Sequence, residues 1–406
     1  MSPSISFSML LDSLHRQGAT HVGLFCNQTA FVFEKRKYLL ELLSESKALK
    51  TVFVPEHGLF SELQDQEPVE AVEAYRAMAE KVEFISLYGQ SEESVRIPAQ
   101  ALTSLTDIVV DIQDVGCRYF TYTTSLAYLI ATLSGIASPP RLWVVDRANP
   151  AGRQVEGTPL PAVFSSFIGH QGLAHRHGLS MGELAIWLTR FYKGTFELRL
   201  VSPTSEDFFF QIFPSPNFPS LQTAQLYSGQ CLFEATNLSE GRGTTRPFEI
   251  IGAPFLGWEK LQRIKHDFEL QTDAIPWLNY VLRPLQFIPT FHKYANQLCG
   301  GFQVHLAMGV VNHSLLNSLV LLQIMNDHVP NLWREGPYEK GNTRTALEIL
   351  VGDKTLINFV NGKESLKVTI DYLKNQENEW IQLMEEVTKK RLFSVFSLPF
   401  LPPTTS

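Results

Sequence analysis

The sequence predicts an α/β protein: a Rossmann-like, doubly wound domain with a parallel sheet, followed by a smaller mixed α+β domain. Short β-branched segments alternate with helical patterns over the first 200 residues, and these segments are apolar almost throughout. Strands of that kind are typical of a parallel sheet that is covered on both faces. The strict alternation then stops, and 406 residues are enough for two domains. We therefore expect residues 1–204 to form the first domain and residues 205–406 to form the second.

In the first domain, apolar segments mark the strands, and apolar residues at three- and four-residue spacing mark the helices. The expected strands cover residues 21–26, 50–54, 82–87, 107–112, 141–145 and 196–201. The expected helices between them cover residues 36–46, 69–80 and 120–134. A further helix over 181–193 has a clear start, because Ser180 and Glu183 stand at the spacing of a capping box.

The second domain begins with the Pro-rich stretch FPSPNFPS, residues 213–220, which interrupts any regular element. The strands expected after it cover residues 285–291 and 301–307, and the expected helices cover residues 257–270, 313–326 and 367–390. Because strands and helices do not alternate strictly here, the pattern predicts an α+β domain.

Composition and charge exclude several classes of protein. The net charge of −7 gives no sign of a nucleic-acid partner. Cys26, Cys117, Cys231 and Cys299 form no C-x-x-C pair, so we interpret them as reduced core residues. No apolar run reaches the ~20 residues of a membrane span, and the N-terminus lacks the basic region of a signal peptide. We therefore expect a cytoplasmic protein without a membrane span.

Polar residues follow several expected strands of the first domain. In a parallel sheet the carboxyl ends of the strands meet at one edge, where ligands bind. Helix N-capping explains some of these residues individually, but their number predicts a common polar crevice. The residues are Asn27, Glu56, His57, Asp114, Arg118, Tyr119 and Asn149.

A second polar cluster follows the expected domain boundary, and it contains Asn217 and Asn237. Its centre is Glu240-Gly241-Arg242-Gly243-Thr244, where glycines let the backbone approach a ligand and Arg242 can bind a carboxylate with its planar fork. The segment lacks the spacing and the Lys of a phosphate-binding P-loop. A tight turn with a surface ion pair is the alternative interpretation.

These segments together resemble the exo-β-N-acetylmuramidases of glycoside hydrolase family 171, the NamZ family, over about residues 20–255. The resemblance implies a Rossmann-like domain, a smaller mixed C-terminal domain and an active site in the cleft between them. It also implies release of N-acetylmuramic acid from the non-reducing ends of peptidoglycan fragments. The matching motifs include CNQTA (26–30), VPEHGLF (54–60), DIVVDIQDVGCRYFTY (107–122), VVDRANPAGRQVEG (144–157) and LYSGQCLFEATNLSEGRGTTRPFEIIGAP (226–254).

Glycoside hydrolysis needs a carboxylic acid that protonates the leaving oxygen, and usually a second carboxylate. Glu56 is the first candidate for the acid and Glu240 for its partner, with Asp114 and Glu156 in reserve. Arg242 and Arg118 are candidates to bind the lactyl carboxylate of a muramyl saccharide. We expect no metal or nucleotide cofactor. The full set of substrate-binding candidates is Asn27, His57, Arg118, Tyr119, Asn149, Asn217, Asn237 and Arg242.

Three other interpretations remain open. A non-catalytic protein that binds cell-wall sugars could keep the same cleft, although the retained carboxylates disfavour it. A nucleotide-binding dehydrogenase is disfavoured because no G-x-G-x-x-G follows the first strand. A metal site at His170, His175 and His177 is disfavoured because these residues lie in a loop without a nearby carboxylate triad.

Overall fold

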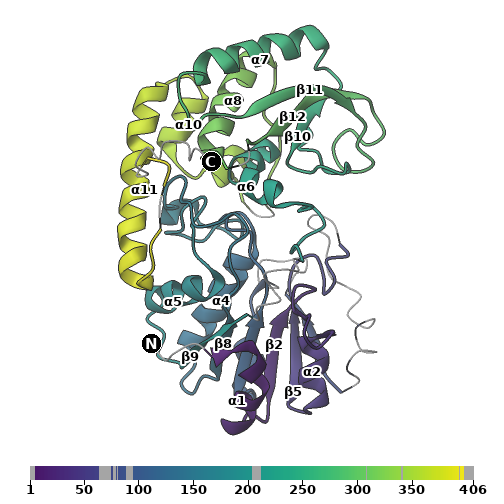
Figure 1. Ribbon diagram of the computed structural model, residues 1–406, viewed down its shortest axis with the longest axis vertical. Coiled ribbons are helices and arrows are strands. Elements are labelled where there is room, and N and C mark those ends of the chain that lie inside the picture. The colour runs from purple at the N-terminus through teal and green to yellow at the C-terminus, as the bar shows by residue number, and fades with distance from the viewer. Residues whose placement is uncertain are drawn as a thin grey trace, which may run out of the picture. The chain divides into compact units, whose positions relative to one another are not determined.

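The computed structural model describes residues 5–63, 75, 79, 81–87, 95–203, 212–307, 309–339, 342–392 and 394–396. The chain packs as two compact units (Figure 1). Unit 1 consists of Met1–Val115, Phe120–Asn149 and Leu179–Pro216, and unit 2 of Gly116–Tyr119, Pro150–Gly178 and Asn217–Ser406. The chain therefore enters unit 2 twice before it passes into it for good at Asn217. The single domain boundary expected near residue 204 stays a prediction.

Unit 1 is built on a parallel sheet, seven-stranded in the described part of the chain. Without the short edge strand β1, its order is that of a doubly wound fold, with the switch point between β2 and β7. The predicted fold class is confirmed. In spatial order the strands are β1 (Ile5–Ser6), β9 (Leu198–Ser202), β8 (Arg141–Val145), β7 (Asp107–Asp111), β2 (Val22–Cys26), β5 (Leu49–Val54) and β6 (Glu83–Ser86).

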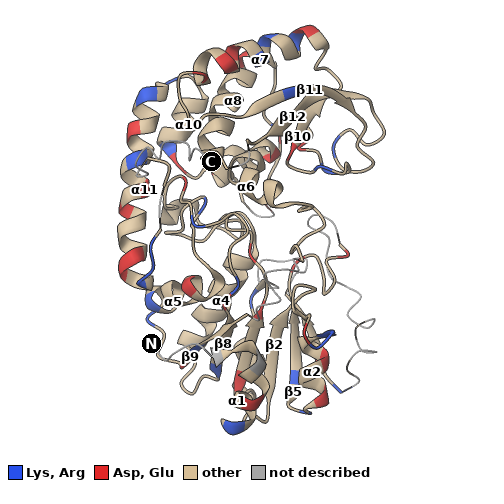
Figure 2. Ribbon diagram, in the orientation of Figure 1, with Lys and Arg blue, Asp and Glu red and all other residues tan. Residues whose placement is uncertain are grey.

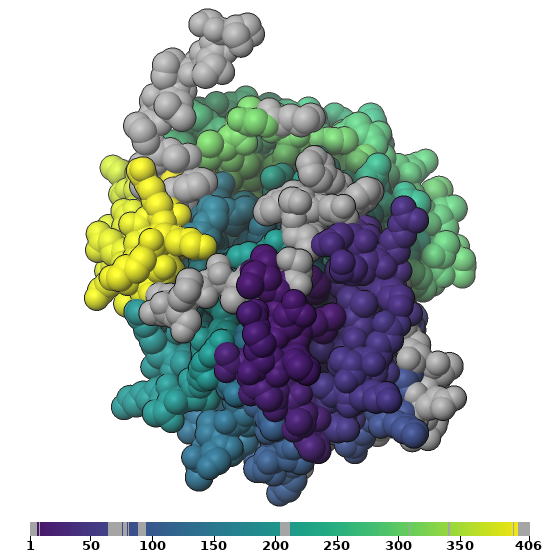
Figure 3. Space-filling view, turned by 60° about the horizontal axis from the view of Figure 1, so that its bottom comes forward, coloured from purple at the N-terminus to yellow at the C-terminus, as the bar shows by residue number. Residues whose placement is uncertain are grey.

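The strands are apolar almost throughout because both faces of the sheet are covered. Val22, Leu24 and Cys26 of β2 pack in one core with residues of helices α1 (Leu10–Arg16) and α2 (Leu39–Glu45). Right-handed crossovers run in opposite directions from the switch point, so the other face receives the later helices (Figure 1). These are α3 (Ala99–Thr103), α4 (Tyr122–Ser134) and α5 (Met181–Phe191). Figure 3 shows the N-terminal residues, including α1, at the surface of unit 1.

Most elements expected in unit 1 are confirmed. Helix α5 begins with the predicted capping box, in which the Ser180 hydroxyl accepts from the backbone N–H of Glu183 and the Glu183 carboxylate accepts from that of Ser180. Helix α2 begins later than expected, because Lys37–Tyr38 pairs as strand β4 with β3 (Phe31–Val32). The helix expected over 69–80 lies mostly outside the described residues.

Unit 2 contains a three-stranded antiparallel sheet in the order β10 (Ile250–Ala253), β12 (Cys299–His305) and β11 (Val281–Phe287). The strand expected over 285–291 is misplaced. Beyond Phe287 the chain meets Pro289, which cannot donate to a ladder, and turns toward Gly243. The described helices are α6 (Leu221–Gln230), α7 (Trp258–Thr272), α8 (Ser314–His328), α9 (Ala346–Val351), α10 (Lys354–Val360) and α11 (Leu366–Thr388).

The long helices α7 and α11 are amphipathic. In α11, Leu373, Trp380 and Met384 are buried at helical spacing. Figure 2 shows charged residues along the outer sides of α7 and α11, whereas the strands of the large sheet carry few. Among the helices of the described chain, none has the length and apolar character needed to cross a membrane.

Candidate functional site

The switch point of unit 1 is lined by polar side chains, as the sequence predicts. Asn27 directly follows β2 and is 1% exposed. Its Oδ1 accepts from the backbone N–H and the hydroxyl of Thr29, and its Nδ2 donates to the Tyr122 hydroxyl at 2.9 Å. Asp111 ends the neighbouring strand β7, where Arg147 donates to it from Nε at 2.7 Å and from Nη2 at 3.2 Å. The two strand ends lie beside each other because β2 pairs with β7, with Cys26 opposite Asp111.

Glu56 lies in the turn that follows β5 and is 8% exposed. The Thr121 hydroxyl donates to its Oε2 at 2.5 Å, and the Tyr122 hydroxyl donates to its backbone carbonyl at 3.1 Å. Tyr122 therefore contacts both Asn27 and Glu56, which brings two of the predicted site residues together. The turn is strained, because His57 has a φ of 72° and left-handed backbone is rare for a residue with a side chain. Strain of this kind concentrates at functional sites.

Three other predicted residues of unit 1 lie around this edge of the sheet. The His57 Nδ1 lies 3.1 Å from the Leu63 carbonyl. Asp114 follows β7 by three residues and is 3% exposed. Asn149 donates to the Leu179 carbonyl at 3.4 Å. All three therefore stay near the carboxyl ends of the strands, where the sequence predicts them.

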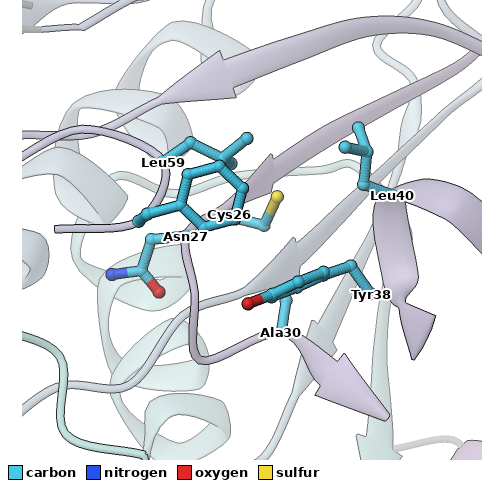
Figure 4. A pocket seen from close by; sticks show the side chains of 7 residues that line it. Cys26, Asn27, Ala30, Tyr38, Leu40 and Leu59 are labelled. Atoms are coloured by element: carbon cyan, nitrogen blue, oxygen red, sulfur yellow. The ribbon is translucent and has the colours of Figure 1, made fainter. Parts of the chain in front are cut away.

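A small recess beside Asn27 is too small for a saccharide. Its volume is about 200 Å³ even with open solvent included, whereas ligand pockets usually measure about 300–1,000 Å³. Its lining is mostly apolar, as Figure 4 shows. The residues that line it are Cys26, Asn27, Ala30, Tyr38, Leu40, Leu59 and Phe60.

The main polar cluster of unit 2 is centred on Glu240, whose side chain is fully buried. Its Oε2 lies 3.0 Å from the Lys293 Nζ, and its Oε1 lies 3.1 Å from the His292 Nδ1 and 3.3 Å from the Arg242 Nε. Burial works to raise the pKa of Glu240, but Lys293, His292 and Arg242 outweigh it and hold that pKa well below its usual range. Glu240 is therefore an ionised carboxylate at neutral pH.

Arg242 connects Glu240 to a second carboxylate. Its Nη2 donates to Glu234 Oε1 at 2.9 Å, and the Tyr338 hydroxyl donates to the other oxygen of Glu234. The Arg242 guanidinium also lies over the ring of Phe248 at 5.0 Å. Both sides of its planar fork thus face carboxylates of the protein itself.

Two glycines let this loop fold so tightly. Gly241 has a φ of 82°, and a Cβ there would lie 2.8 Å from the carbonyl oxygens of Arg246 and Ile250. Gly243 has a φ of 79°, and a Cβ there would lie 2.7 Å from the backbone of Phe291. The glycines of the E-G-R-G-T segment therefore serve close backbone packing within unit 2.

Glu156 lies in a separate buried network of unit 2. Arg176 and Gln154 donate to its Oε1, while the Ser228 hydroxyl and the backbone N–H of Leu315 donate to its Oε2. Burial works to raise the pKa of Glu156, but Arg176 and the hydrogen bonds lower it. These contacts favour a structural role over the predicted catalytic one.

Arg118 is likewise buried in unit 2 and is 1% exposed. Its guanidinium donates to the carbonyls of Thr158 at 2.9 Å and Val351 at 2.8 Å, and its Nη2 lies 2.9 Å from the His175 Nε2. Burial lowers the pKa of Arg118 to about 10. The neighbouring Tyr119 hydroxyl donates to the Ser228 carbonyl at 3.0 Å. Both side chains bind the protein's own backbone, which favours structural roles.

The two predicted asparagines of unit 2 differ in their surroundings. Asn237 donates from Nδ2 to the carbonyls of Asn331 at 2.8 Å and Trp333 at 3.0 Å, which joins two segments of the chain. Asn217 is 4% exposed in the Pro-rich stretch. The side chain of Asn237 therefore holds the segment before Glu240 against residues 331–333.

His170, His175 and His177, which were weighed and disfavoured as a metal site, have other surroundings in the structure. Among the described residues, no group of three or more His, Cys, Asp or Glu side chains is arranged to hold a metal ion. His175 instead accepts from the backbone N–H of Thr158 at its Nδ1. Burial lowers the pKa of His170 to about 4, so this side chain is neutral near pH 7.

Two models of known protein families together match nearly the whole described chain. The family model described as exo-beta-N-acetylmuramidase NamZ, N-terminal, matches residues 22–222, and the one described as NamZ, C-terminal, matches residues 225–388. The chain belongs to the NamZ family. The two family matches meet within ten residues of Asn217, where the chain passes into unit 2 for good.

Individual proteins similar to this NamZ family member support the same family and fold. The peptidoglycan beta-N-acetylmuramidase NamZ of Bacillus subtilis (strain 168) is 30% identical over 373 residues, which cover 86% of this chain and 85% of the relative. Two crystal structures of DUF1343 family proteins from Bacteroides fragilis share the fold. One has a TM-score of 0.73 at 21% identity and covers 93% of this chain and 97% of its own. The other has a TM-score of 0.64 at 22% identity and covers 91% of this chain and 94% of its own.

Several side chains around Glu56 and Glu240 of this NamZ chain were not predicted from the sequence. Thr121 and Tyr122 could have been found, because they follow the predicted β7 motif within the segment DIVVDIQDVGCRYFTY. His292 and Lys293 lie about 50 residues after Glu240, directly after the segment expected to be a strand, and carry no local signal. Only the folded chain brings them to Glu240.

Proposed function

We propose that this protein is an exo-β-N-acetylmuramidase, which releases N-acetylmuramic acid from the non-reducing end of peptidoglycan fragments. The proposal rests on the matches to the N-terminal and C-terminal NamZ family models. It rests equally on the 30% identity to the B. subtilis peptidoglycan beta-N-acetylmuramidase over most of both chains. The substrate is thus a muramyl saccharide. The cytoplasmic location expected from the sequence stays a prediction.

We assign the general acid to Glu56. Hydrolysis requires a carboxyl group that protonates the leaving glycosidic oxygen. Glu56 lies at the ligand-binding edge of a doubly wound sheet, in a strained turn, with Thr121 orienting its Oε2. This combination of edge position, burial and backbone strain supports Glu56 over the other predicted carboxylates.

Glu240 serves the reaction in its ionised form. Because Lys293, His292 and Arg242 hold its pKa low, it is suited to stabilise positive charge or to orient His292, and it is not suited to donate a proton. That Glu240 acts with Glu56 as a catalytic pair stays a prediction. Asp114 is the reserve for the second carboxylate, because β7 and β5 flank β2 in the same sheet.

Neither predicted arginine is assigned to the lactyl carboxylate. Arg118 is saturated by backbone carbonyls, and Arg242 faces Glu234 and Glu240. If Arg242→Lys leaves the KM for muramyl substrates unchanged, the arginine holds the loop and does not bind substrate.

The test is a product assay with a β-linked MurNAc–GlcNAc disaccharide, without added metal or cofactor. We expect free N-acetylmuramic acid, and much slower release of N-acetylglucosamine from chitobiose. Binding of the muramyl disaccharide without any release would instead support the non-catalytic sugar-binding protein. Equal cleavage of both disaccharides would contradict recognition of the lactyl group, and loss of activity on chelation would contradict a metal-free mechanism.

A further inference from the structure

Two neighbouring residues at the start of α4 hold Glu56 from its two ends. The Thr121 hydroxyl donates to the side-chain oxygen Oε2 at 2.5 Å, and the Tyr122 hydroxyl donates to the backbone carbonyl at 3.1 Å. Thr121 is 7% exposed and Tyr122 is 0% exposed. All three residues belong to unit 1, so the arrangement lies within one unit.

The Thr121 hydroxyl does not play the usual part of a threonine at the start of a helix. Thr121 is the N-cap of α4, where a threonine side chain normally accepts from a backbone N–H of the first turn. Its backbone is helical instead, with a φ of −64° and a ψ of −14°, and its side chain makes no capping hydrogen bond. Among the residues that the structure describes, Glu56 is the sole side-chain hydrogen-bond partner of Thr121. The hydroxyl is therefore committed to Glu56.

This hydrogen bond distinguishes the two oxygens of Glu56. The carbonyl oxygen of a neutral carboxyl group is a better acceptor than its hydroxyl oxygen, so a donor on Oε2 favours the proton on Oε1. A hydrogen bond to an ionised acceptor is roughly twice as strong as one between neutral groups. The Thr121 hydroxyl therefore also stabilises the carboxylate that remains once Glu56 has given up its proton.

The backbone of the Glu56 turn is held by other contacts. His57 and Ser61 have φ values of 72° and 55°, left-handed backbone that persists only where the surroundings impose it. The Ser61 hydroxyl donates to Gln28 Oε1 at 2.7 Å, and the Tyr122 hydroxyl reaches the Glu56 carbonyl. None of these contacts uses the Thr121 side chain. A change at Thr121 should therefore alter the carboxyl group without releasing the turn.

We infer that Thr121 is a positioning residue for the general acid, which holds Oε2 so that Oε1 delivers the proton. In that step the proton passes from Oε1 to the glycosidic oxygen, which keeps the electron pair of the breaking C–O bond. Glu56 is left as a carboxylate and the sugar as an oxocarbenium-like species, and water completes the hydrolysis. The inference rests on the proposed function. It adds that Thr121 sets the rate of proton transfer and the pH range in which Glu56 serves as an acid.

The experiment compares Thr121→Val, which removes the hydroxyl and keeps the branched shape, with Thr121→Ser, which keeps the hydroxyl. On the MurNAc–GlcNAc disaccharide we expect Thr121→Val to lower kcat by at least about tenfold, part of the contribution of a general acid, with KM changed less than about twofold. Thr121→Ser should stay within about threefold of the wild type.

Thr124→Val is the matched control, because it makes the same change one turn further along α4. Thr124 is 1% exposed, and its hydroxyl has no hydrogen-bond partner among the described residues. Its removal should leave kcat, KM and the pH profile unchanged. Urea unfolding of every variant separates a loss of activity from a loss of folding. If Thr121→Val does not fold, Thr121→Ala takes its place in the same measurements.

The pH profile gives a readout that a merely structural role would not move. Glu56 can act as an acid only while it is protonated, so kcat/KM falls on the alkaline side. Loss of the Thr121 donor makes the ionised form less stable, so this limb should move to higher pH by at least about half a unit in Thr121→Val. Burial raises the pKa of Tyr122, which therefore stays neutral. The titratable groups around the turn are the same in every variant: His57, Glu62, Asp114 and Tyr122.

Full activity in Thr121→Val would overturn the inference, and so would an equal loss of kcat in Thr121→Val and Thr121→Ser. An alkaline limb that stays in place while kcat falls would overturn it too. Failure of the proposed function is distinguishable. It fails if the wild type releases no muramic acid, and its assignment of the acid fails if Glu56→Gln stays active, whatever the Thr121 variants do.

Discussion

Glu240 owes its chemistry to basic side chains that come from different parts of the chain. Lys293, His292 and Arg242 surround a carboxylate that is completely shielded from water. A buried charge is stable only when it is paired, and the loss of one partner leaves the others uncompensated. The same residue is therefore a functional candidate and a structural centre of its loop.

Glu240→Gln should destabilise the protein as well as reduce its activity. Breaking a buried pair typically costs about 3–5 kcal/mol, so urea unfolding at pH 7 should show a loss of that order. Because the folded pKa of Glu240 is depressed, its contribution is complete above the ordinary value of about 4.3 and declines as the pH falls below it. The difference between variant and wild type should therefore shrink in acid. Glu259→Gln, whose side chain is 91% exposed, is the control and should be neutral. A constant difference down to pH 3 would contradict the ion-pair explanation.

Glu56→Gln should behave differently, because it removes a proton donor and keeps the shape of the side chain. General acid catalysis typically contributes about 10²–10⁴-fold, so kcat on the muramyl disaccharide should fall by at least about two orders of magnitude. The midpoint of thermal unfolding should change little. Glu83→Gln, at an exposed position on β6 of the same unit, should retain full activity. A fall in kcat below tenfold would remove Glu56 from the mechanism.

Among the elements, the 239–249 loop depends most on its glycines. Gly241 has left-handed backbone, and carbonyl oxygens stand where a side chain would begin. Its neighbours are main-chain atoms of the same loop and of β10, which cannot rotate away. The loop therefore holds Glu240 and Arg242 in place only with glycine at this position.

Gly241→Ala should destabilise the protein by at least about 1–2 kcal/mol, the cost of left-handed backbone alone, with the clash in addition. Gly257→Ala is the control. Gly257 precedes α7 with a φ of −73°, and a Cβ there would meet nothing within 4 Å. Gly257 is the N-cap of α7, where alanine is less favourable than glycine, but alanine also lowers the entropy of the unfolded chain. Because these two effects oppose each other, the net change in the free energy of unfolding should stay below about 1 kcal/mol. Equal effects of the two substitutions in urea unfolding would show that the loop relaxes around an alanine.

All four cysteine thiols of the molecule are buried. Cys26 and Cys231 are each 1% exposed and Cys117 and Cys299 are 0% exposed. Burial raises the pKa of the Cys26 and Cys231 thiols well above the usual value, which reduces their thiolate further. No pair of these thiols is joined in the structure.

The folded protein should therefore resist a thiol reagent such as 5,5′-dithiobis(2-nitrobenzoate). We expect no cysteine to react within minutes in the native state, and all four to react in denaturant. Activity should be the same with and without a reducing agent. Rapid labelling of one thiol in the native state would show that its part of the fold opens readily.

The strands of unit 1, and the edge at which its polar residues gather, could be predicted from the amino-acid sequence. Parallel strands covered on both faces need apolar residues throughout, and such runs are visible without a structure. Their carboxyl ends then fall at one edge by topology, and Asn27, Glu56 and Asp114 follow strands that end there. The glycines of the Glu240 loop were visible too, but the sequence suggested that they let the backbone approach a ligand, whereas in the structure they allow close packing against main-chain atoms of unit 2.

The pairing of charged side chains, in contrast, could not be predicted before the chain was seen folded. Arg118 and Arg242 look alike in the sequence, yet one is saturated by backbone carbonyls and the other by two carboxylates. Glu377 lies on the buried stripe of α11, where spacing alone predicts an apolar residue, because His313 lies 2.8 Å away to pair with it. Electrostatic partners are set by distance in space, and residues far apart in the sequence, such as Glu240 and Lys293, become neighbours only when the chain packs.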